Sequence, residues 1–112
     1  MDTKQELILE MAANTNMTDE RARELAHSNW YMNMSPLEAA MLQMLQEKLC
    51  MPSIDEFQKV TEMALGREIS ANRIPCHKLL VEIAVKILHQ KSRGQFYEVA
   101  KSVVALSQQY IQ

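Results

Sequence analysis

Glycine is nearly absent from this chain, which holds only Gly66 and Gly94 among its 112 residues. Each glycine follows a segment with apolar residues at helical spacing, where a helix often ends in a left-handed residue. Long apolar runs are missing as well. The longest, such as VVAL at 103–106, fall far short of the roughly 20 residues that a membrane-spanning helix needs. These absences favour a helical chain that does not span a membrane.

Cysteine is equally scarce, with only Cys50 and Cys76 and no C-x-x-C pair. This usage fits a reducing compartment better than a disulfide scaffold, so we expect both thiols to be free. The opening sequence MDTKQELILEM is acidic and lacks the basic flank, apolar run and cleavage pattern of a signal peptide. We therefore expect the protein in the cytoplasm.

Catalytic motifs are also lacking, since no Gly-rich phosphate loop, G-x-S-x-G or H-E-x-x-H is present. Cys76 and His77 could be a nucleophile and base, but helix neighbours point about 100° apart. The histidines and cysteines also lack the paired spacings of zinc ligands. We therefore expect no enzyme, metal or cofactor, and a buried structural thiol at Cys76. An enzyme with Cys76 as nucleophile is the third-ranked alternative.

The length and the ordinary globular composition of the chain predict one domain over 1–112. Charge is distributed unevenly along it. Residues 1–65 hold five Lys and Arg against eleven Asp and Glu, or −6, whereas residues 66–112 hold seven against three, or +4. The difference could reflect acidic helices that face basic helices inside the fold, head-to-tail self-association, or a basic face for an anionic partner. The internal arrangement is the preferred of these interpretations.

Helix starts are legible in the sequence. SPLE and SIDE place Ser35 and Ser53 as N-caps with a glutamate three residues later, and Thr18 can cap another start. No useful length alternates with period two, so we predict an all-α bundle without strands. Because the fifth helix is apolar around most of its circumference, we expect it at the centre. The predicted helices span about 3–13, 19–31, 36–50, 54–65, 75–92 and 95–111.

The stretch LGREISANRIPCHKLL at 65–80 combines glycine, arginine and proline in one connection. A helix-turn-helix would place Pro75 inside its recognition helix, which proline breaks. We therefore predict a joint in which Gly66 ends one helix and Pro75 begins the next.

Basic residues of the C-terminal half supply an alternative function. They could form a sequence-independent phosphate surface for a nucleic acid, although no aromatic residues are interleaved for base stacking. A solvated basic face is the preferred interpretation. The residues of this alternative are Arg67, Arg73, Lys78, Lys86, Lys91 and Arg93.

The segment NWYMNM at 29–34 gathers aromatic and methionine side chains in a connection. Amphipathic aromatics and flexible thioethers suit adaptable partner surfaces, and they also fill irregular cores. The candidate partner-binding residues are Trp30, Tyr31, Met32 and Met34. If they form an interface, Trp30 or Tyr31 should be partly exposed; if they fill the core, all four should be buried.

The sequence KLCMPSIDEFQKVTEMALGREISANRI at 48–74 resembles the centre of a small phage-encoded domain family of unknown function. Leu65, Gly66 and Arg67 match its Leu-Gly-Arg, whereas Glu68 and Ile69 replace Pro-Val and the following residues do not reproduce its Thr-His-Glu. The resemblance implies a phage or prophage source and transfers no catalytic residue.

Together these patterns predict a non-enzymatic protein-interaction module in the cytoplasm, an accessory or regulatory protein of a phage or prophage. Its partner is another protein, and self-association is one form the interaction could take. The main alternative is a nucleic-acid-binding protein.

Overall fold

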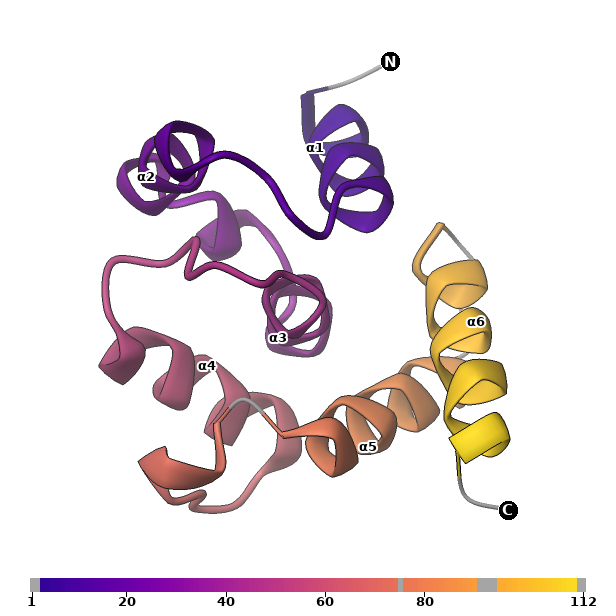
Figure 1. Cartoon of the computed structure of the whole chain (residues 1–112). Helices are drawn as coiled ribbons and strands as arrows, with labels where there is room; N and C mark the ends of the chain where they lie inside the picture. Colours follow the sequence, from indigo (N-terminus) through magenta and orange to yellow (C-terminus); the bar gives the residue numbers. More distant parts are fainter. Residues whose placement is uncertain (1–2, 75, 91–94, 111–112) are drawn as a thin grey trace.

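The computed structural model describes residues 3–74, 76–90 and 95–110, and every regular element within these ranges is helical. In chain order the elements are α1 (Thr3–Ala13), α2 (Asp19–Ser28), the 3-10 turn η1 (Trp30–Asn33), α3 (Pro36–Met44), α4 (Ile54–Leu65), the 3-10 turn η2 (Ala71–Arg73), α5 (His77–Leu88) and α6 (Gln95–Tyr110). The all-α prediction with six α-helices is confirmed (Figure 1).

The predicted N-caps begin three of these helices. The Ser35 hydroxyl accepts a bond from the Glu38 backbone N–H, and the Glu38 carboxylate accepts one from the Ser35 N–H, which completes a capping box on α3. The Ser53 hydroxyl accepts from the Glu56 backbone N–H at 3.2 Å and caps α4. Thr18 caps α2 through its side-chain oxygen. These local bonds explain why the starts could be predicted.

The connection between α4 and α5 is a joint, as predicted. Gly66 has a left-handed φ of 69° and its N–H bonds to the Glu62 carbonyl oxygen at 2.8 Å, which ends α4. The Glu62 carboxylate then accepts from the Ile69 N–H at 2.9 Å, and the Gln58 amide donates to the Ile69 carbonyl at 2.8 Å. Two side chains of α4 therefore hold the joint. Pro75 lies outside the described residues, and α5 begins at His77 with Cys76 as its N-cap, which corrects the prediction that the helix begins at Pro75.

The helix predicted over 19–31 is interrupted at Asn29. Its φ of 57° is left-handed, a conformation that asparagine tolerates better than most residues. The chain then enters η1, where the Met32 N–H bonds to the Asn29 carbonyl oxygen at 3.0 Å. This break directs Trp30 and Tyr31 into the interior instead of continuing the surface of α2.

The helix predicted over 36–50 ends at Met44. It stops there because the buried side chain of Gln43 forms hydrogen bonds with the backbone of the loop that follows. The Gln43 amide donates to the Lys48 carbonyl at 3.0 Å and accepts from the Cys50 N–H at 2.7 Å. Gln43 is only 2% exposed, so these bonds satisfy a polar group that would be costly to bury alone.

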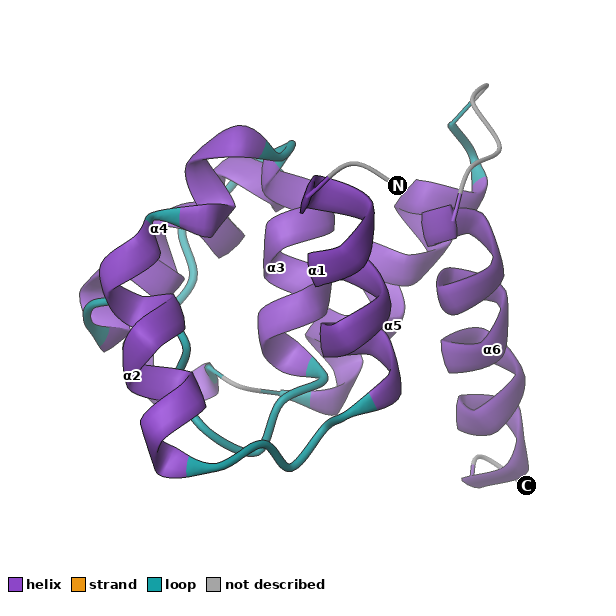
Figure 2. Ribbon diagram, turned by 90° about the horizontal axis from the view of Figure 1, so that it is seen from above, coloured by secondary structure: helices purple, strands orange, loops and turns teal. Residues whose placement is uncertain are grey.

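The centre of the bundle is α3, which corrects the prediction that the fifth helix lies there. Residues 39–43 of α3 are at most 2% exposed, and the helix contacts α1, α4 and α5 (Figure 2). Small side chains at Ala39 and Ala40 let these neighbours approach closely. In contrast, α5 buries one face, which includes Ile83 and Ile87, and leaves Val85 37% exposed. Helix α5 packs against both α3 and α6.

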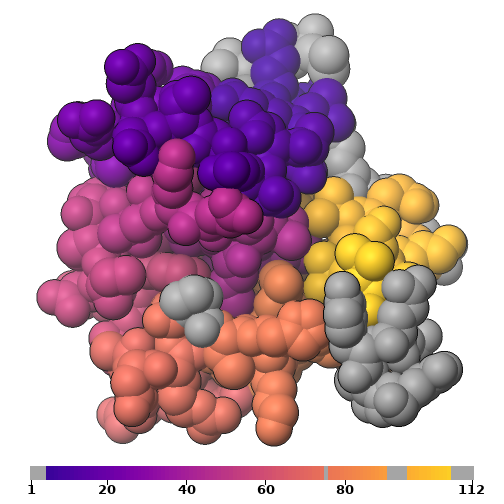
Figure 3. Space-filling model, in the orientation of Figure 1, coloured from indigo at the N-terminus to yellow at the C-terminus, as the bar shows by residue number. Residues whose placement is uncertain are grey.

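Helix α6 packs mainly on α5 at one edge of the molecule, where Phe96, Ala100 and Val103 are buried. The space-filling view shows the N-terminal third gathered at the opposite end from α5 (Figure 3). The acidic residues of the N-terminal third and the basic residues of α5 therefore lie at different ends of the molecule.

Candidate functional site

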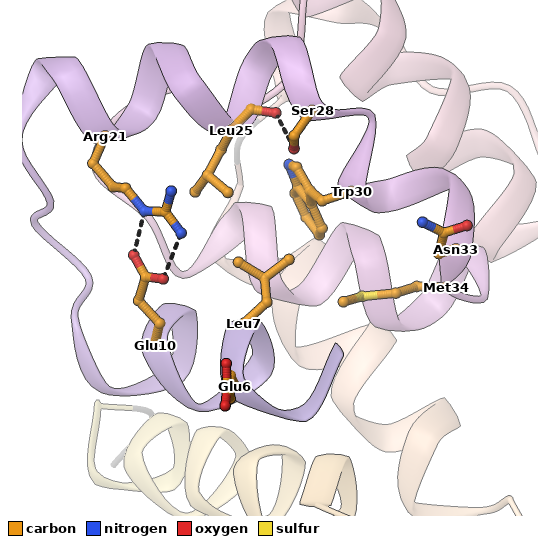
Figure 4. A pocket seen from close by; sticks show the side chains of 9 residues that line it. All are labelled: Glu6, Leu7, Glu10, Arg21, Leu25, Ser28, Trp30, Asn33 and Met34. Carbon is orange, nitrogen blue, oxygen red and sulfur yellow. Dashed lines mark hydrogen bonds and ion pairs between the residues drawn. The ribbon is translucent and has the colours of Figure 1, made fainter. Parts of the chain in front are cut away.

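A groove of about 370 Å³ opens between α1, α2 and η1, and we call it the α1–α2 groove. Its apolar residues are Leu7 from α1, Leu25 from α2, Trp30 from η1 and Met34 just after η1. The Arg21 and Glu10 side chains meet at one end of the view, Met34 lies toward the other, and the two leucines and the indole lie between (Figure 4). Its volume lies near the lower end of the range of roughly 300–1,000 Å³ for ligand pockets.

Trp30 forms the floor of the groove and is fixed on two sides. Its indole Nε1–H donates to the Cys50 carbonyl oxygen at 2.9 Å. Its ring meets the Tyr31 ring edge to face, with centroids 5.9 Å apart and planes at 84°. Trp30 is only 4% exposed, so the floor is a rigid part of the core.

A bidentate ion pair joins α1 to α2 at one end of the groove. Arg21 Nε and Nη2 donate to the two Glu10 carboxylate oxygens at 2.6 and 2.7 Å. These bonds hold the pKa of Glu10 below its usual value, against the opposing effect of burial, and they raise the pKa of Arg21. Glu24 also accepts from Arg21 Nη1, at 3.2 Å. The Arg21–Glu10 pair closes the groove end, and Glu24 leaves one negative charge in excess there.

The other acidic residue that lines the groove is Glu6. Glu6 is exposed and makes no ion pair within the described parts of the chain. The groove-lining residues lie between positions 6 and 34. In the sequence, residues 1–34 carry six Asp and Glu against three Lys and Arg, or −3. The groove therefore combines an apolar floor with negative surroundings.

The ion pairs do not neutralise the charge difference between the two halves of the chain. Among the described residues, each pair joins partners from the same half: four lie within residues 1–65, and Arg67 with Glu82 lies within residues 66–112. The preferred interpretation, in which acidic helices face basic ones within the fold, therefore gains no support from ion pairs among these residues. Both charged surfaces remain available to partners.

The predicted partner-binding residues separate into three environments. Trp30 and Met34 line the groove. Tyr31 is buried away from it, with its hydroxyl 3.4 Å from a Glu56 carboxylate oxygen, and burial raises its pKa. Met32 is 69% exposed and does not line the groove. The expectation that an interface exposes Trp30 or Tyr31 is not met, because they are 4% and 7% exposed, and the pure core-filling expectation fails at Met32.

Sequence reasoning missed the residues that complete the groove. Leu7 and Leu25 lie on different helices, and Glu10 and Arg21 are eleven residues apart across the α1–α2 connection. No spacing rule brings such positions together, since that requires the packing of two helices.

The basic residues of the alternative function differ in their surroundings. Arg67 Nη1 and Nη2 both donate to the Glu82 carboxylate, which lowers the pKa of Glu82. Arg73, Lys78 and Lys86 are exposed. Lys91 and Arg93 lie outside the described residues.

The two cysteines are free, as predicted, but their environments differ. Cys50 is fully buried, and burial raises the pKa of its thiol to about 11. Cys76 is partly exposed, which corrects the prediction that it is buried. It is the N-cap of α5, where its side chain packs against the edge of the core and stays partly accessible to solvent. In the described ranges, no three His, Cys, Asp or Glu side chains gather as metal ligands.

No family model, curated protein or solved structure matches the chain. Among the described residues, no helix has the length and apolar character required to cross a membrane.

Proposed function

We propose that this protein is a non-enzymatic protein-interaction module of the cytoplasm and that it binds a partner protein in the α1–α2 groove. The observation that carries the proposal is the combination of an apolar floor, formed by Leu7, Leu25, Trp30 and Met34, with an acidic surface that internal ion pairs leave unbalanced. Apolar anchors surrounded by charge are typical of protein recognition sites.

The rigidity of the groove supports this function. Trp30 is held by Cys50 and Tyr31, and the Arg21–Glu10 pair fixes α2 against α1. A groove that exists before its partner arrives loses less conformational entropy on binding.

The cysteine chemistry supports a binding function over thiol catalysis. The Cys50 thiol is buried, and its raised pKa disfavours the nucleophilic thiolate. Cys76 and His77 line a shallow surface depression with Met44 and Leu80, and neither is hydrogen-bonded to the other in the described contacts. The resemblance of residues 48–74 to a phage-encoded family supports extending the proposal to a phage or prophage accessory or regulatory protein.

Affinity capture with matched pairs of variants tests the proposal. Leu7→Ala and Met34→Ala alter the groove, whereas Leu9→Ala and Met32→Ala remove exposed side chains from the same helix and the same connection. The full-length chain and the four variants are immobilised and exposed to extract of the native host, and captured proteins are quantified by mass spectrometry. We expect a partner that both groove variants lose and both control variants keep.

Two other outcomes contradict the proposal. If all four variants capture the same proteins equally, the groove is not the binding site. If capture disappears after nuclease treatment and after Arg73→Ala with Lys78→Ala, the basic surface and a nucleic acid are responsible instead. Circular dichroism of each variant confirms that the loss of a partner is not a loss of folding.

A further inference from the structure

We infer that the α1–α2 groove receives an amphipathic α-helix of a separate protein, with its apolar face in the groove and a lysine or arginine beside Glu6. This inference rests on the proposed function and adds the form and charge of the partner segment.

The architecture favours a helix over an extended segment. The regular elements of the described chain are all helices, so it offers no strand edge to which an extended peptide could add. The groove instead lies between two helices, with η1 closing its floor. Apolar residues at helical spacing on a partner would place neighbouring side chains along Leu7, Leu25 and Met34.

The charge of the groove favours a basic partner. Glu10 is already paired with Arg21, whereas Glu6, one helical turn earlier on α1, has no cationic partner among the described residues. A lysine or arginine at the flank of the bound helix would supply the missing charge. The net charge of −3 over residues 1–34 also attracts a basic segment before contact is made.

A second copy of this chain is a poorer match. The exposed basic residues of the described C-terminal half are Arg67, which is paired with Glu82, and Arg73, Lys78, Lys86 and Lys101, and the large apolar side chain exposed on α5 is Val85 at only 37%. That surface brings positive charge but little apolar area to fill the groove. The more exposed Leu106, at 56%, lies on α6, where the described part carries a single exposed basic residue, Lys101.

Selection from a displayed library of random peptides, roughly 16 residues or four helical turns long, tests the inference. The full-length protein is the target, and binders are sorted for clones that lose binding to both Leu7→Ala and Met34→Ala. We expect the sorted clones to carry net positive charge and apolar residues at i, i+3 and i+4. A proline placed at the centre of such a peptide should abolish its binding.

A charge-reversal pair tests the role of Glu6. Glu6 and Glu98 are both exposed acids in the first turn of a helix, but only Glu6 borders the groove. Glu6→Lys should weaken the binding of the basic peptides about threefold to tenfold at low salt, and Glu98→Lys should leave it within about twofold.

Several results would overturn the inference. The inference is wrong if the sorted peptides are acidic or lack helical spacing, or if no clone depends on the groove. It is also wrong if Glu6→Lys and Glu98→Lys weaken binding equally. A dimer seen by light scattering that both groove variants dissociate would make a second copy the occupant. If the peptide results fail while partner capture still depends on Leu7 and Met34, the inference is wrong and the proposed function stands. If capture is also independent of the groove, both are wrong.

Discussion

The indole nitrogen of Trp30 donates a 2.9 Å hydrogen bond to the carbonyl oxygen of Cys50, twenty residues further along the chain. The bond ties η1 to the loop that follows α3 and satisfies the polar atom of a ring that is only 4% exposed. The same ring forms the floor of the α1–α2 groove. Trp30 therefore supports the groove from within the core, and substitutions there act first on folding.

Trp30→Ala should lower the free energy of unfolding by about 3–5 kcal/mol, because it removes a large buried side chain and leaves a cavity. Trp30→Phe should lower it by roughly 1–3 kcal/mol, since the Cys50 carbonyl loses its donor. Urea denaturation measures both. Met32→Ala is the control, and because Met32 is 69% exposed we expect a change within about 0.5 kcal/mol. Equal effects of Trp30→Ala and Met32→Ala would contradict the buried placement of the indole.

Helix ends in this protein could be predicted because they depend on a few neighbouring residues. Ser35 with Glu38, Ser53 and Gly66 each act within one helical turn. The ends that differed from prediction depend on more distant contacts. Gln43 stops α3 by bonding to the loop up to seven residues ahead, which no local pattern of apolar residues reports.

The groove could be predicted only in part. The composition of NWYMNM drew attention to Trp30 and Met34, which do line it. Which side chains would be exposed could not be predicted, because a single left-handed residue, Asn29, turns the two rings inward and leaves Met32 outside. The central helix was misjudged for a related reason: apolar content does not distinguish a helix with two neighbours from one enclosed on all sides.

Gly66→Ala should destabilise the protein by about 1 kcal/mol through the backbone alone. Its φ is 69°, and an added Cβ would meet no atom within 4 Å, so no steric clash contributes. Thermal or urea denaturation measures the change. Gly66→Asn is the matched control and should cost less, because asparagine enters the left-handed region more readily than alanine. Equal costs for the two variants would mean that conformation at this position is not the cause.

Three positions on α5 distinguish its buried face from its exposed one. Ile83 is fully buried, and Ile83→Ala should cost roughly 2–5 kcal/mol. Ile87→Ala should cost a similar amount, because Ile87 is 2% exposed. Val85→Ala should cost well under about 1 kcal/mol, because that side chain already contacts water. If Val85→Ala destabilised the protein as much as Ile83→Ala, α5 would be enclosed on both faces, as the sequence alone predicted.

The ion pair at the groove end should give the protein a defined pH dependence. Because the pKa of Glu10 is lowered in the folded state, the pair stabilises the protein above the unfolded value, near 4.5, and this stabilisation disappears as the pH falls through the folded value. Glu10→Gln should therefore cost about 1 kcal/mol at pH 7, a figure reduced for solvent screening because both side chains are about one-third exposed.

The difference between the parent protein and Glu10→Gln should shrink below about pH 4.5 and vanish once Glu10 is protonated in both states. Urea denaturation from pH 7 to pH 3 follows it. Glu6→Gln is the control on the same helix, because Glu6 forms no ion pair among the described residues, and it should change the free energy of unfolding by less than about 0.5 kcal/mol at pH 7. A Glu10→Gln difference that stays constant across this range would show that the carboxylate charge contributes nothing.

Thiol labelling should separate the two cysteines. Cys76 is partly exposed at the start of α5, so iodoacetamide can reach it in the native protein. Cys50 is fully buried, and with a pKa of about 11 its thiolate makes up about one part in a thousand at pH 8. Mass spectrometry should therefore show one label in native protein and two in denaturant. Cys76→Ser should leave native protein unlabelled at the same times. Rapid labelling of that variant would mean that the loop held by Gln43 and Trp30 opens readily, because Cys50 reacts only when those bonds to its backbone break.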